Sequence, residues 1–163
     1  RVTALPEVDE SYPDTLSGEE IPLYISQEKA AAYRRFMKDN TLLITADTIV
    51  WLNGKVYGKP RDIADAKAML QALSGKTHTV ITGVTLTSLQ KQISFAVSTE
   101  VTFAALGDDE IDYYVETYRP LDKAGAYGVQ EWIGYIGVTE LKGSYYNVMG
   151  LPIQRLYTEL KKF

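Results

Sequence analysis

The segment TLLITADTIVWL, residues 41–52, constrains the fold more than any other part of the chain. Its β-branched residues fit the pleated, half-buried surface of a sheet. Asn53 and Gly54 follow directly, and this dipeptide is the strongest short signal for a two-residue hairpin turn. The sequence therefore predicts a sheet in which this strand is joined to the next one by a tight hairpin.

Helical and extended patterns alternate along the rest of the 163 residues. Apolar residues recur at helical spacing in several segments, and the runs between them have strand character. The predicted elements are an extended segment at residues 1–5, a helix from near Pro22, helices over 61–73 (with Asp62 as its N-cap) and 108–118, strands near 79–89 and 92–104, short strands within 126–140, and a final helix from about Leu151. Interspersed strands and helices predict a single α/β domain with a mixed sheet.

The composition excludes several kinds of site. The chain has no cysteine, and His78 is its one histidine. Disulfide frameworks, thiolate nucleophiles, cysteine-based zinc sites and multi-histidine metal sites are therefore excluded. The setting KTHTVITGV favours a packed or surface imidazole for His78. Chemistry in this chain must rest on carboxylates, lysines, hydroxyls and a metal bound through oxygen.

The charge balance bears on partners and location. Lys and Arg number 17 against 21 Asp and Glu, a net charge of −4. This balance argues against binding a nucleic acid polymer, which needs many cations to neutralise phosphates, but not against binding a single nucleotide. No apolar run of about 18 residues predicts a membrane span, and no signal-peptide pattern opens the chain. We therefore expect no membrane association and a cytoplasmic location.

Asp47 is the strongest single candidate for chemistry. It interrupts the apolar and β-branched run LLITADTIV, where an aspartate suits a strand poorly. A buried carboxylate is expensive unless it is paired, hydrogen-bonded or bound to a metal. One interpretation is a metal ligand or a general base for attack by water. The other is an aspartate at a strand edge or bulge that bonds a neighbouring backbone amide.

Lys29 shares the apolar face of the first predicted helix with Ile25, Ala32 and Phe36. A lysine among core-facing residues costs stability unless its ammonium is paired or reaches solvent. The position of Lys29 therefore indicates a functional partner.

Three further segments allow a functional and a structural interpretation. GKVYGKP places Lys55 and Lys59 among glycines, which let backbone approach a phosphate, although a hairpin rim with solvated lysines is the simpler interpretation. In DKAGAYGVQ, Gln130 can read a base edge or lie on the surface at a strand end. KGSYYNVMGLP, residues 142–152, resembles a loop that enters a helix, where an anion can bind, or a simple turn and cap.

Eight short motifs, in order and at plausible spacings, together resemble the Maf family. They cover the chain from Val8 to about Leu160. The motifs are DES (9–11), EKA (28–30), ADT (46–48), GKP (58–60), LSG followed by HTVITGV (73–84), STEVTF (98–103), DKAGAYGVQ (122–130) and GSYYNVMGLP (143–152).

The resemblance implies a fold and an activity. Maf proteins are similar to inosine triphosphate pyrophosphatases, with an elongated, twisted mixed sheet flanked by helices and a central cleft between two lobes. They are housecleaning hydrolases that depend on a divalent cation, Mg²⁺ or Mn²⁺, and cleave between the α- and β-phosphates. For this chain the implied substrates are dTTP, UTP or modified pyrimidine nucleotides. Family members are often homodimers.

The resemblance also implies roles for individual residues. Asp47 matches the catalytic aspartate that accepts a proton from water, although a role as metal ligand together with Glu10 competes with that assignment. Lys29 matches the lysine of the active cleft. Lys59 and Lys123 match cations that face the triphosphate.

Thr48 and Gln130 match the pair that distinguishes the dTTP/UTP branch of the family from the branch that prefers 7-methyl-GTP.

One departure from the family concerns the beginning of the chain. Family members open with a strand, a loop of the type SxSPRR and a helix, and this motif does not appear in the sequence. We expect residues 1–163 to form a single Maf-like domain that lacks this segment. Truncation or omission is favoured over natural absence, because a first strand missing from mid-sheet leaves unpaired edges. An alternative function is a nucleotide-binding regulator of cell division, or septum formation, with little catalysis.

Overall fold

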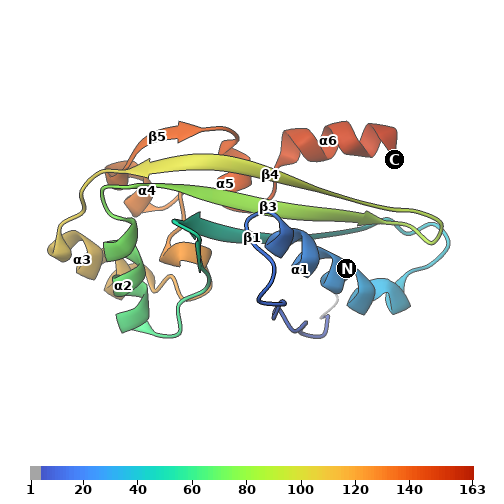
Figure 1. Ribbon diagram of the computed structural model, residues 1–163, viewed down its shortest axis with the longest axis horizontal. Helices are drawn as coiled ribbons and strands as arrows, with labels where there is room; N and C mark the ends of the chain where they lie inside the picture. Colours follow the sequence, from blue (N-terminus) through green and yellow to red (C-terminus); the bar gives the residue numbers. More distant parts are fainter. Residues whose placement is uncertain (1–4) are drawn as a thin grey trace.

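The computed structural model describes residues 5–163, which form a five-stranded sheet flanked by six α-helices (Figure 1). The strand order in the sheet is β2-β1-β3-β4-β5. The extended segment predicted at residues 1–5 lies outside the described residues, apart from Leu5. The strands are β1 (Leu43–Leu52), β2 (Lys55–Tyr57), β3 (Thr77–Thr87), β4 (Gln92–Phe103) and β5 (Val138–Lys142).

Every strand pairing among the described residues is antiparallel, so the predicted mixed sheet is wrong for this part of the chain. Short turns join β1 to β2 and β3 to β4, and such turns return the chain in the opposite direction. Strands β2 and β3 both run antiparallel to β1 and lie on either side of it. The helix Ile63–Leu73 connects them and returns the chain, so that β3 starts beside the end of β1, with Thr79 opposite Trp51.

The predicted hairpin turn and helix cap are confirmed. Asn53 and Gly54 have φ values of 51° and 77°, and positive φ at both central residues is what the favoured two-residue hairpin turn requires. Asp62 caps the next helix by accepting a hydrogen bond of 2.8 Å from the backbone N–H of Asp65.

The α-helices lie mostly where the sequence places them, with one exception. Residues 126–140 were expected to hold short strands, but most of the segment is not extended, and only β5 begins in it. A helical turn there buries Ile133 and Gly137, so tertiary packing decides the local structure. The helices are α1 (Glu20–Tyr33), α2 (Ile63–Leu73), α3 (Asp108–Tyr118), α4 (Trp132–Gly137), α5 (Tyr145–Met149) and α6 (Ile153–Lys162). None of the helices within residues 5–163 is long and apolar enough to cross a membrane.

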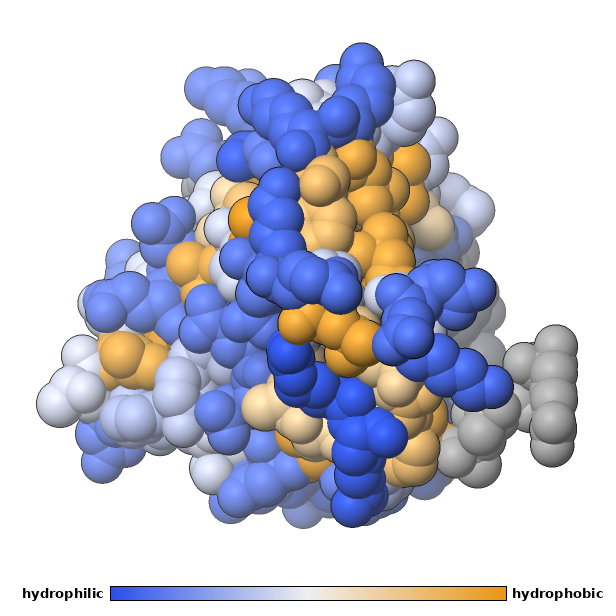
Figure 2. Space-filling view, turned by 90° about the vertical axis from the view of Figure 1, so that its right-hand side faces the viewer, coloured by the Kyte–Doolittle hydropathy of each residue, from blue (hydrophilic) through white to orange (hydrophobic). Residues whose placement is uncertain are grey.

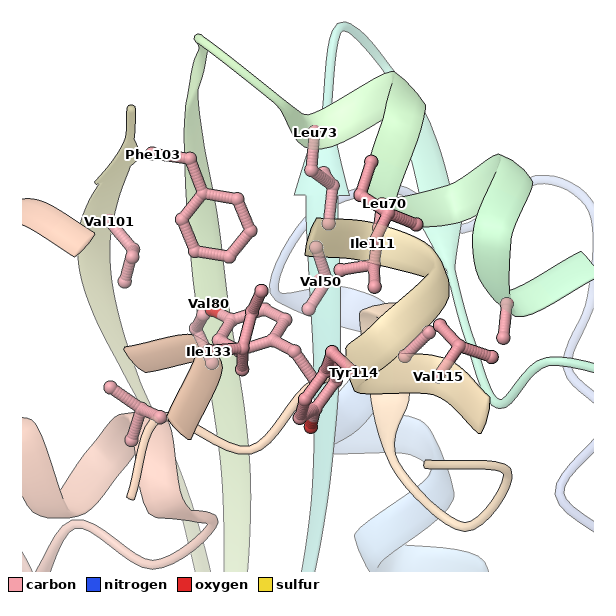
Figure 3. Close-up of a cluster of buried hydrophobic side chains, with 14 of the residues drawn as sticks. Val50, Leu70, Leu73, Val80, Val101, Phe103, Ile111, Tyr114, Val115 and Ile133 are labelled. Atoms are coloured by element: carbon pink, nitrogen blue, oxygen red, sulfur yellow. The ribbon is translucent and has the colours of Figure 1, made fainter. Parts of the chain in front are cut away.

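The main core forms where α2, α3 and α4 pack against one end of the sheet (Figures 1 and 3). Figure 3 shows side chains from these helices pointing toward the strands. Burying one such aliphatic side chain contributes about 1.5–3 kcal/mol. The buried residues labelled there are Val50, Leu70, Leu73, Val80, Val101, Phe103, Ile111, Tyr114, Val115 and Ile133.

Helix α1 packs on the opposite face of the sheet and is held there tightly. Ile21 and Ile25 pack against Ile49 and Ile81 of the strands. The backbone of α1 comes so close to β3 that a Cβ on Gly83 would lie 2.4 Å from the carbonyl carbon of Pro22. Only glycine permits this approach, so Gly83 sets the position of α1 and of the lysine that α1 carries.

The predicted apolar face of α1 is correct for Ile25 but wrong for Phe36. Helix α1 ends at Tyr33, and Phe36 lies in a following 3₁₀ turn where it is 52% exposed. Leu42 and Ile44 are also exposed, and Ile44 pairs with Leu86 near the β3–β4 turn. Figure 2, which views the molecule from that end, shows apolar side chains exposed between hydrophilic ones.

Candidate functional site

The candidate site is a cleft along the open edge of β1. Strand β2 pairs only with residues 50–52 of β1, so among the described strands residues 43–49 pair with β3 alone. Beside this edge is a cleft of about 360 Å³, which lies within the range of small-molecule sites. Its walls come from the segment before α1, from α1, β1 and β2, from the loop before α4, and from the end of α5.

The structure brings all the site residues predicted from the sequence to this one cleft. They come from segments far apart in the chain, and their roles stay predictions. The residues are Glu10, Lys29, Asp47, Thr48, Lys59, Lys123 and Gln130.

Asp47 and Lys29 form a partly buried ion pair at the centre of the cleft. Lys29 Nζ lies 3.4 Å from Asp47 Oδ1, and it donates a hydrogen bond of 3.0 Å to the carbonyl oxygen of Ala46. Asp47 Oδ2 is buried and has no hydrogen-bond partner within residues 5–163. The lysine that looked misplaced on an apolar helix face is thus paired, while one oxygen of the aspartate has no hydrogen-bond partner among these residues.

Burial raises the pKa of Asp47 to about 6. The side chain is only 11% exposed, and removing the carboxylate from water disfavours its charged form. The ammonium of Lys29 acts in the opposite direction and lowers this pKa, while the carboxylate of Glu10 raises it. Asp47 is therefore a stronger base than an ordinary aspartate, and it is still ionised at neutral pH.

Glu10 and Lys59 extend the charged cluster toward solvent. Glu10 Oε1 lies 3.2 Å from Lys29 Nζ, and its Oε2 lies 3.8 Å from Lys59 Nζ. Lys59 is 59% exposed, so its ammonium can turn toward a ligand at little cost. Lys55, its neighbour in GKVYGKP, instead lies over the ring of Tyr57 at 4.8 Å and is not part of the cleft wall.

The loop before α4, which carries Lys123 and Gln130, is held by a buried tyrosine. The Tyr114 hydroxyl donates to Glu131 Oε1 at 2.9 Å and accepts from the Gly128 N–H at 3.1 Å. Lys123 Nζ lies 3.7 Å from the same Glu131 oxygen. The Tyr114 hydroxyl thus holds the loop in place, while Gln130 remains exposed at the cleft.

Asp47 and Thr48 point to opposite faces of the sheet, as neighbours in a strand do. Asp47 pairs with Gly83, on the face where α1 packs. Thr48 pairs with Thr82, which donates a hydrogen bond to the Asn147 carbonyl of α5. Both residues nevertheless line the one cleft.

The segment 142–152 contributes the C-terminal end of α5 to the cleft wall. Within this segment, Ser144 caps the N-terminus of α5 by accepting from the Asn147 N–H at 3.1 Å, and the opposite end of α5, with Met149 and Gly150, lines the cleft. Anion binding at the N-terminus of α6, the helix that follows the segment, stays a prediction.

Sequence reasoning missed the contribution of Asn147, because its partners lie 48 to 67 residues away in the chain. No local signal identifies such partners.

His78 is packed in the core, which confirms one of the two roles considered for it. Its Nε2 lies 2.6 Å from the hydroxyl of Tyr127, and its ring contacts Phe103 edge-on. Burial lowers the pKa of His78 to about 4, so the imidazole is neutral at physiological pH.

The carboxylates of the cleft fit a hard divalent cation that binds together with phosphate. Within residues 5–163 no group of three or more His, Cys, Asp or Glu side chains is arranged to hold a metal. Mg²⁺, however, is usually bound by one or two carboxylates plus phosphate oxygens of the substrate. The two carboxylates that line the cleft, Asp47 and Glu10, match that pattern.

The fold and the cleft define an α/β protein with a buried carboxylate among lysines, a type of site that suits a phosphate-bearing ligand. A family model described as Maf-like protein matches residues 2–163, and the chain belongs to the Maf family.

Close relatives share the chain over nearly its whole length. A protein of Phocaeicola vulgatus is 66% identical over 161 residues, which cover 99% of this chain and 83% of the relative. A protein of Parabacteroides distasonis is 57% identical over 162 residues, 99% of this chain and 84% of the relative. A protein of Flavobacterium psychrophilum is 48% identical over 156 residues, 96% of this chain and 80% of the relative. All three carry the name dTTP/UTP pyrophosphatase.

Proposed function

We propose that the protein is a nucleoside triphosphate pyrophosphatase that hydrolyses dTTP and UTP to the monophosphate and pyrophosphate. The observation that carries the proposal is Asp47, a buried carboxylate with a raised pKa and one unpartnered oxygen, set among lysines in a ligand-sized cleft. The names of close relatives, dTTP/UTP pyrophosphatase, support the substrate class.

The lysines of the cleft bind the triphosphate in this proposal. Lys29, Lys59 and Lys123 approach the cleft from three different segments, and each ammonium offers a compact charge with three donors. Their charge reduces the repulsion between an approaching water molecule and the polyanion. Glu10 holds Lys29 and Lys59 near each other in the free protein, at 3.2 and 3.8 Å.

Asp47 acts as the proton acceptor. Its carboxylate takes a proton from water while the water oxygen bonds to the α-phosphorus. The bond between this phosphorus and the α–β bridging oxygen breaks, and its electron pair leaves with pyrophosphate. A pKa of about 6 places the base near the operating pH, where positioned proton transfer contributes about 10²- to 10⁴-fold in rate.

In the competing assignment, Asp47 and Glu10 would hold a divalent cation, Mg²⁺ or Mn²⁺. When bound, such a cation neutralises phosphate charge and orients the phosphate oxygens. Mn²⁺ affinity distinguishes the two assignments of Asp47. If the residue is a ligand, Asp47→Asn weakens Mn²⁺ binding in calorimetry. If it serves only as the base, Mn²⁺ affinity is retained while turnover is lost.

The cleft also divides the packed helices into two proposed lobes. One contains α2, α3 and α4 around the main core, and the other contains α1 against the opposite face. The homodimer implied by the family resemblance stays a prediction, which size-exclusion chromatography with light scattering tests.

Pyrophosphate release from a panel of nucleoside triphosphates, with Mg²⁺ or Mn²⁺ and the complete gene product, tests the function. UTP and dTTP should be turned over in preference to purine nucleotides. Lys59→Met should lower kcat/KM, whereas Lys55→Met, in the same hairpin but outside the cleft, is the matched control and should not. Tight UTP binding without turnover would favour the regulatory alternative.

A further inference from the structure

Thr48 presents a hydroxyl at the cleft, but two protein groups compete for its proton. Its Oγ1 lies 2.8 Å from the Oγ1 of Thr82 and 3.4 Å from the carbonyl oxygen of Gly150. Thr82 is fully buried, and its hydroxyl is also 3.2 Å from the carbonyl oxygen of Asn147. Two hydroxyl oxygens 2.8 Å apart must share a proton, since lone pairs facing each other at this distance repel.

Two proton arrangements satisfy these contacts. In the first, Thr82 donates to the Asn147 carbonyl and Thr48 donates to Thr82. In the second, Thr48 donates to the Gly150 carbonyl and Thr82 donates to Thr48. The first arrangement is favoured, because it combines contacts of 2.8 and 3.2 Å, whereas the second relies on the weak contact of 3.4 Å and leaves the Asn147 carbonyl without the Thr82 donor. In the first arrangement the single proton of Thr48 goes to Thr82. Thr48 therefore offers only lone pairs to a ligand in the cleft.

Asn147 keeps the two carbonyls of this network in place. The side chain is completely buried, and its Nδ2 lies 3.0 Å from both the Val97 carbonyl oxygen and the Thr99 hydroxyl. A third contact of 3.3 Å reaches the Val80 carbonyl oxygen. These contacts tie α5 to β3 and β4, so the Asn147 and Gly150 carbonyls cannot drift away from the threonines.

The position of Thr48 suits contact with a nucleobase, and this step rests on the function proposed above. Lysines draw the triphosphate toward Asp47, and Thr48 lies on the other face of the strand. The cleft wall beside it is apolar, with Val50, Val80 and Val148. Uracil and thymine carry an N3–H donor between two carbonyl groups, whereas cytosine carries a lone pair at N3.

We propose that Thr82 and Asn147 are positioning residues that fix Thr48 as a hydrogen-bond acceptor for the N3–H of uracil or thymine. A base with a lone pair at N3 meets the lone pairs of Thr48 and is rejected. The Gln130 amide can rotate to present either its carbonyl or its amino group, so it serves the neighbouring exocyclic group of either base. Discrimination between UTP and CTP thus depends on Thr48.

Thr82→Val tests this proposal in the complete protein, with the ratio of kcat/KM for UTP to that for CTP as the readout. Valine has the shape of threonine but neither accepts from nor donates to Thr48. The Thr48 hydroxyl is then left to the weak 3.4 Å contact and can turn its proton toward the ligand. We expect the UTP:CTP ratio to fall by about 10-fold.

Two control variants accompany Thr82→Val. Thr82→Ser restores the hydroxyl and should restore the ratio. Thr77→Val removes a comparable threonine pair on the same strand, Thr77 with Thr102 at 2.7 Å, away from the cleft, and should leave the ratio unchanged.

The outcomes separate this inference from the proposed function. A Thr82→Val protein that folds, loses activity toward UTP and CTP equally and keeps the ratio would overturn the inference, since a purely structural role predicts that result. If Thr82→Val does not fold, Thr82→Ala also removes the hydroxyl and provides the same test: the ratio should fall by about 10-fold, and an unchanged ratio overturns the inference. A wild-type protein with no turnover of UTP or dTTP contradicts the proposed function instead.

Discussion

Replacing Asp47 with asparagine should stabilise the folded protein and abolish its turnover. Asparagine has the shape of aspartate and still accepts a hydrogen bond from Lys29, but it places no charge in the cleft. Lys29 keeps its contacts with Glu10 at 3.2 Å and with the Ala46 carbonyl at 3.0 Å. The substitution therefore removes the cost of burying the carboxylate without leaving the lysine unpaired.

The magnitude follows from the pKa of Asp47. Burial raises it from 3.8 to about 6, and at 1.36 kcal/mol per pH unit this gap corresponds to about 3 kcal/mol. The folded protein binds the proton more tightly than the unfolded chain. The free energy of unfolding therefore falls as pH rises from 3.8 to about 6, and the cost is complete above that range. Asp47→Asn should gain about 3 kcal/mol at pH 8 and nothing at pH 3.5.

His78 changes the free energy of unfolding over a similar pH range, with the opposite sign. Burial lowers its pKa from 6.5 to about 4, so the unfolded chain binds the proton more tightly, and stability is lost as pH falls from 6.5 to about 4. That gap also corresponds to about 3 kcal/mol. In the wild-type protein the contributions of Asp47 and His78 to the pH dependence of stability nearly cancel. In Asp47→Asn only that of His78 remains, so the variant should lose stability on acidification.

Urea denaturation of both proteins between pH 3.5 and 8, followed by circular dichroism, measures these free energies. At pH 8 the variant should also melt roughly 6–12 °C higher than the wild type. A variant that is less stable than the wild type at pH 8 would refute the reasoning. It would mean that the attraction between Asp47 and Lys29 outweighs the cost of burial.

The remaining predictions concern the pH dependence of kcat/KM, Lys29 of α1, and the close contact of α1 with Gly83. The acid limb of the pH profile of kcat/KM for UTP should have its midpoint near pH 6, because Asp47 must be ionised to accept a proton and burial raises its pKa to about 6. Assays from pH 4.5 to 8.5 locate this midpoint. Lys29→Met should move that midpoint upward, since the Lys29 ammonium lowers the pKa of Asp47, and should reduce kcat/KM at pH 7.5 by roughly 10- to 100-fold. An unmoved midpoint would contradict this assignment. Gly83→Ala should destabilise the protein by about 1–3 kcal/mol, because the added Cβ would lie 2.4 Å from the Pro22 carbonyl carbon; an unchanged urea midpoint would show that α1 can shift freely.

Much of the fold could be predicted because its signals are local. The β-branched run before Asn53 and Gly54 fixes the first hairpin, and Asp62 marks the start of α2. The direction of the strands could not be predicted in this way. It depends on α2 returning the chain, so that β2 and β3 run in the same direction on either side of β1, and no local pattern specifies which strands become neighbours.

The candidate site was predictable where a residue conflicts with its surroundings. Asp47 in an apolar strand and Lys29 on an apolar helix face each look costly alone, and the structure shows them paired with each other. Thr82 and Asn147 give no such signal, because a threonine in a strand and an asparagine near a turn are ordinary. Their importance arises from hydrogen bonds between distant segments.

The spacing of Asp47 and Thr48 has a consequence that follows from strand geometry. Adjacent residues point to opposite faces, so two residues meant to act on one ligand in the interior of a sheet would be separated by an even number of positions. Here they are neighbours, and both nevertheless line the same cleft. The alternation of side chains along β1 thus separates the charged wall of Asp47 and Lys29 from the acceptor wall of Thr48 within one cleft. A one-residue slip of β1 against β3 would exchange the two walls and present the carboxylate to α5. The dense contacts of α1 and α5 with opposite faces of β3, at Gly83 and Thr82, oppose that slip.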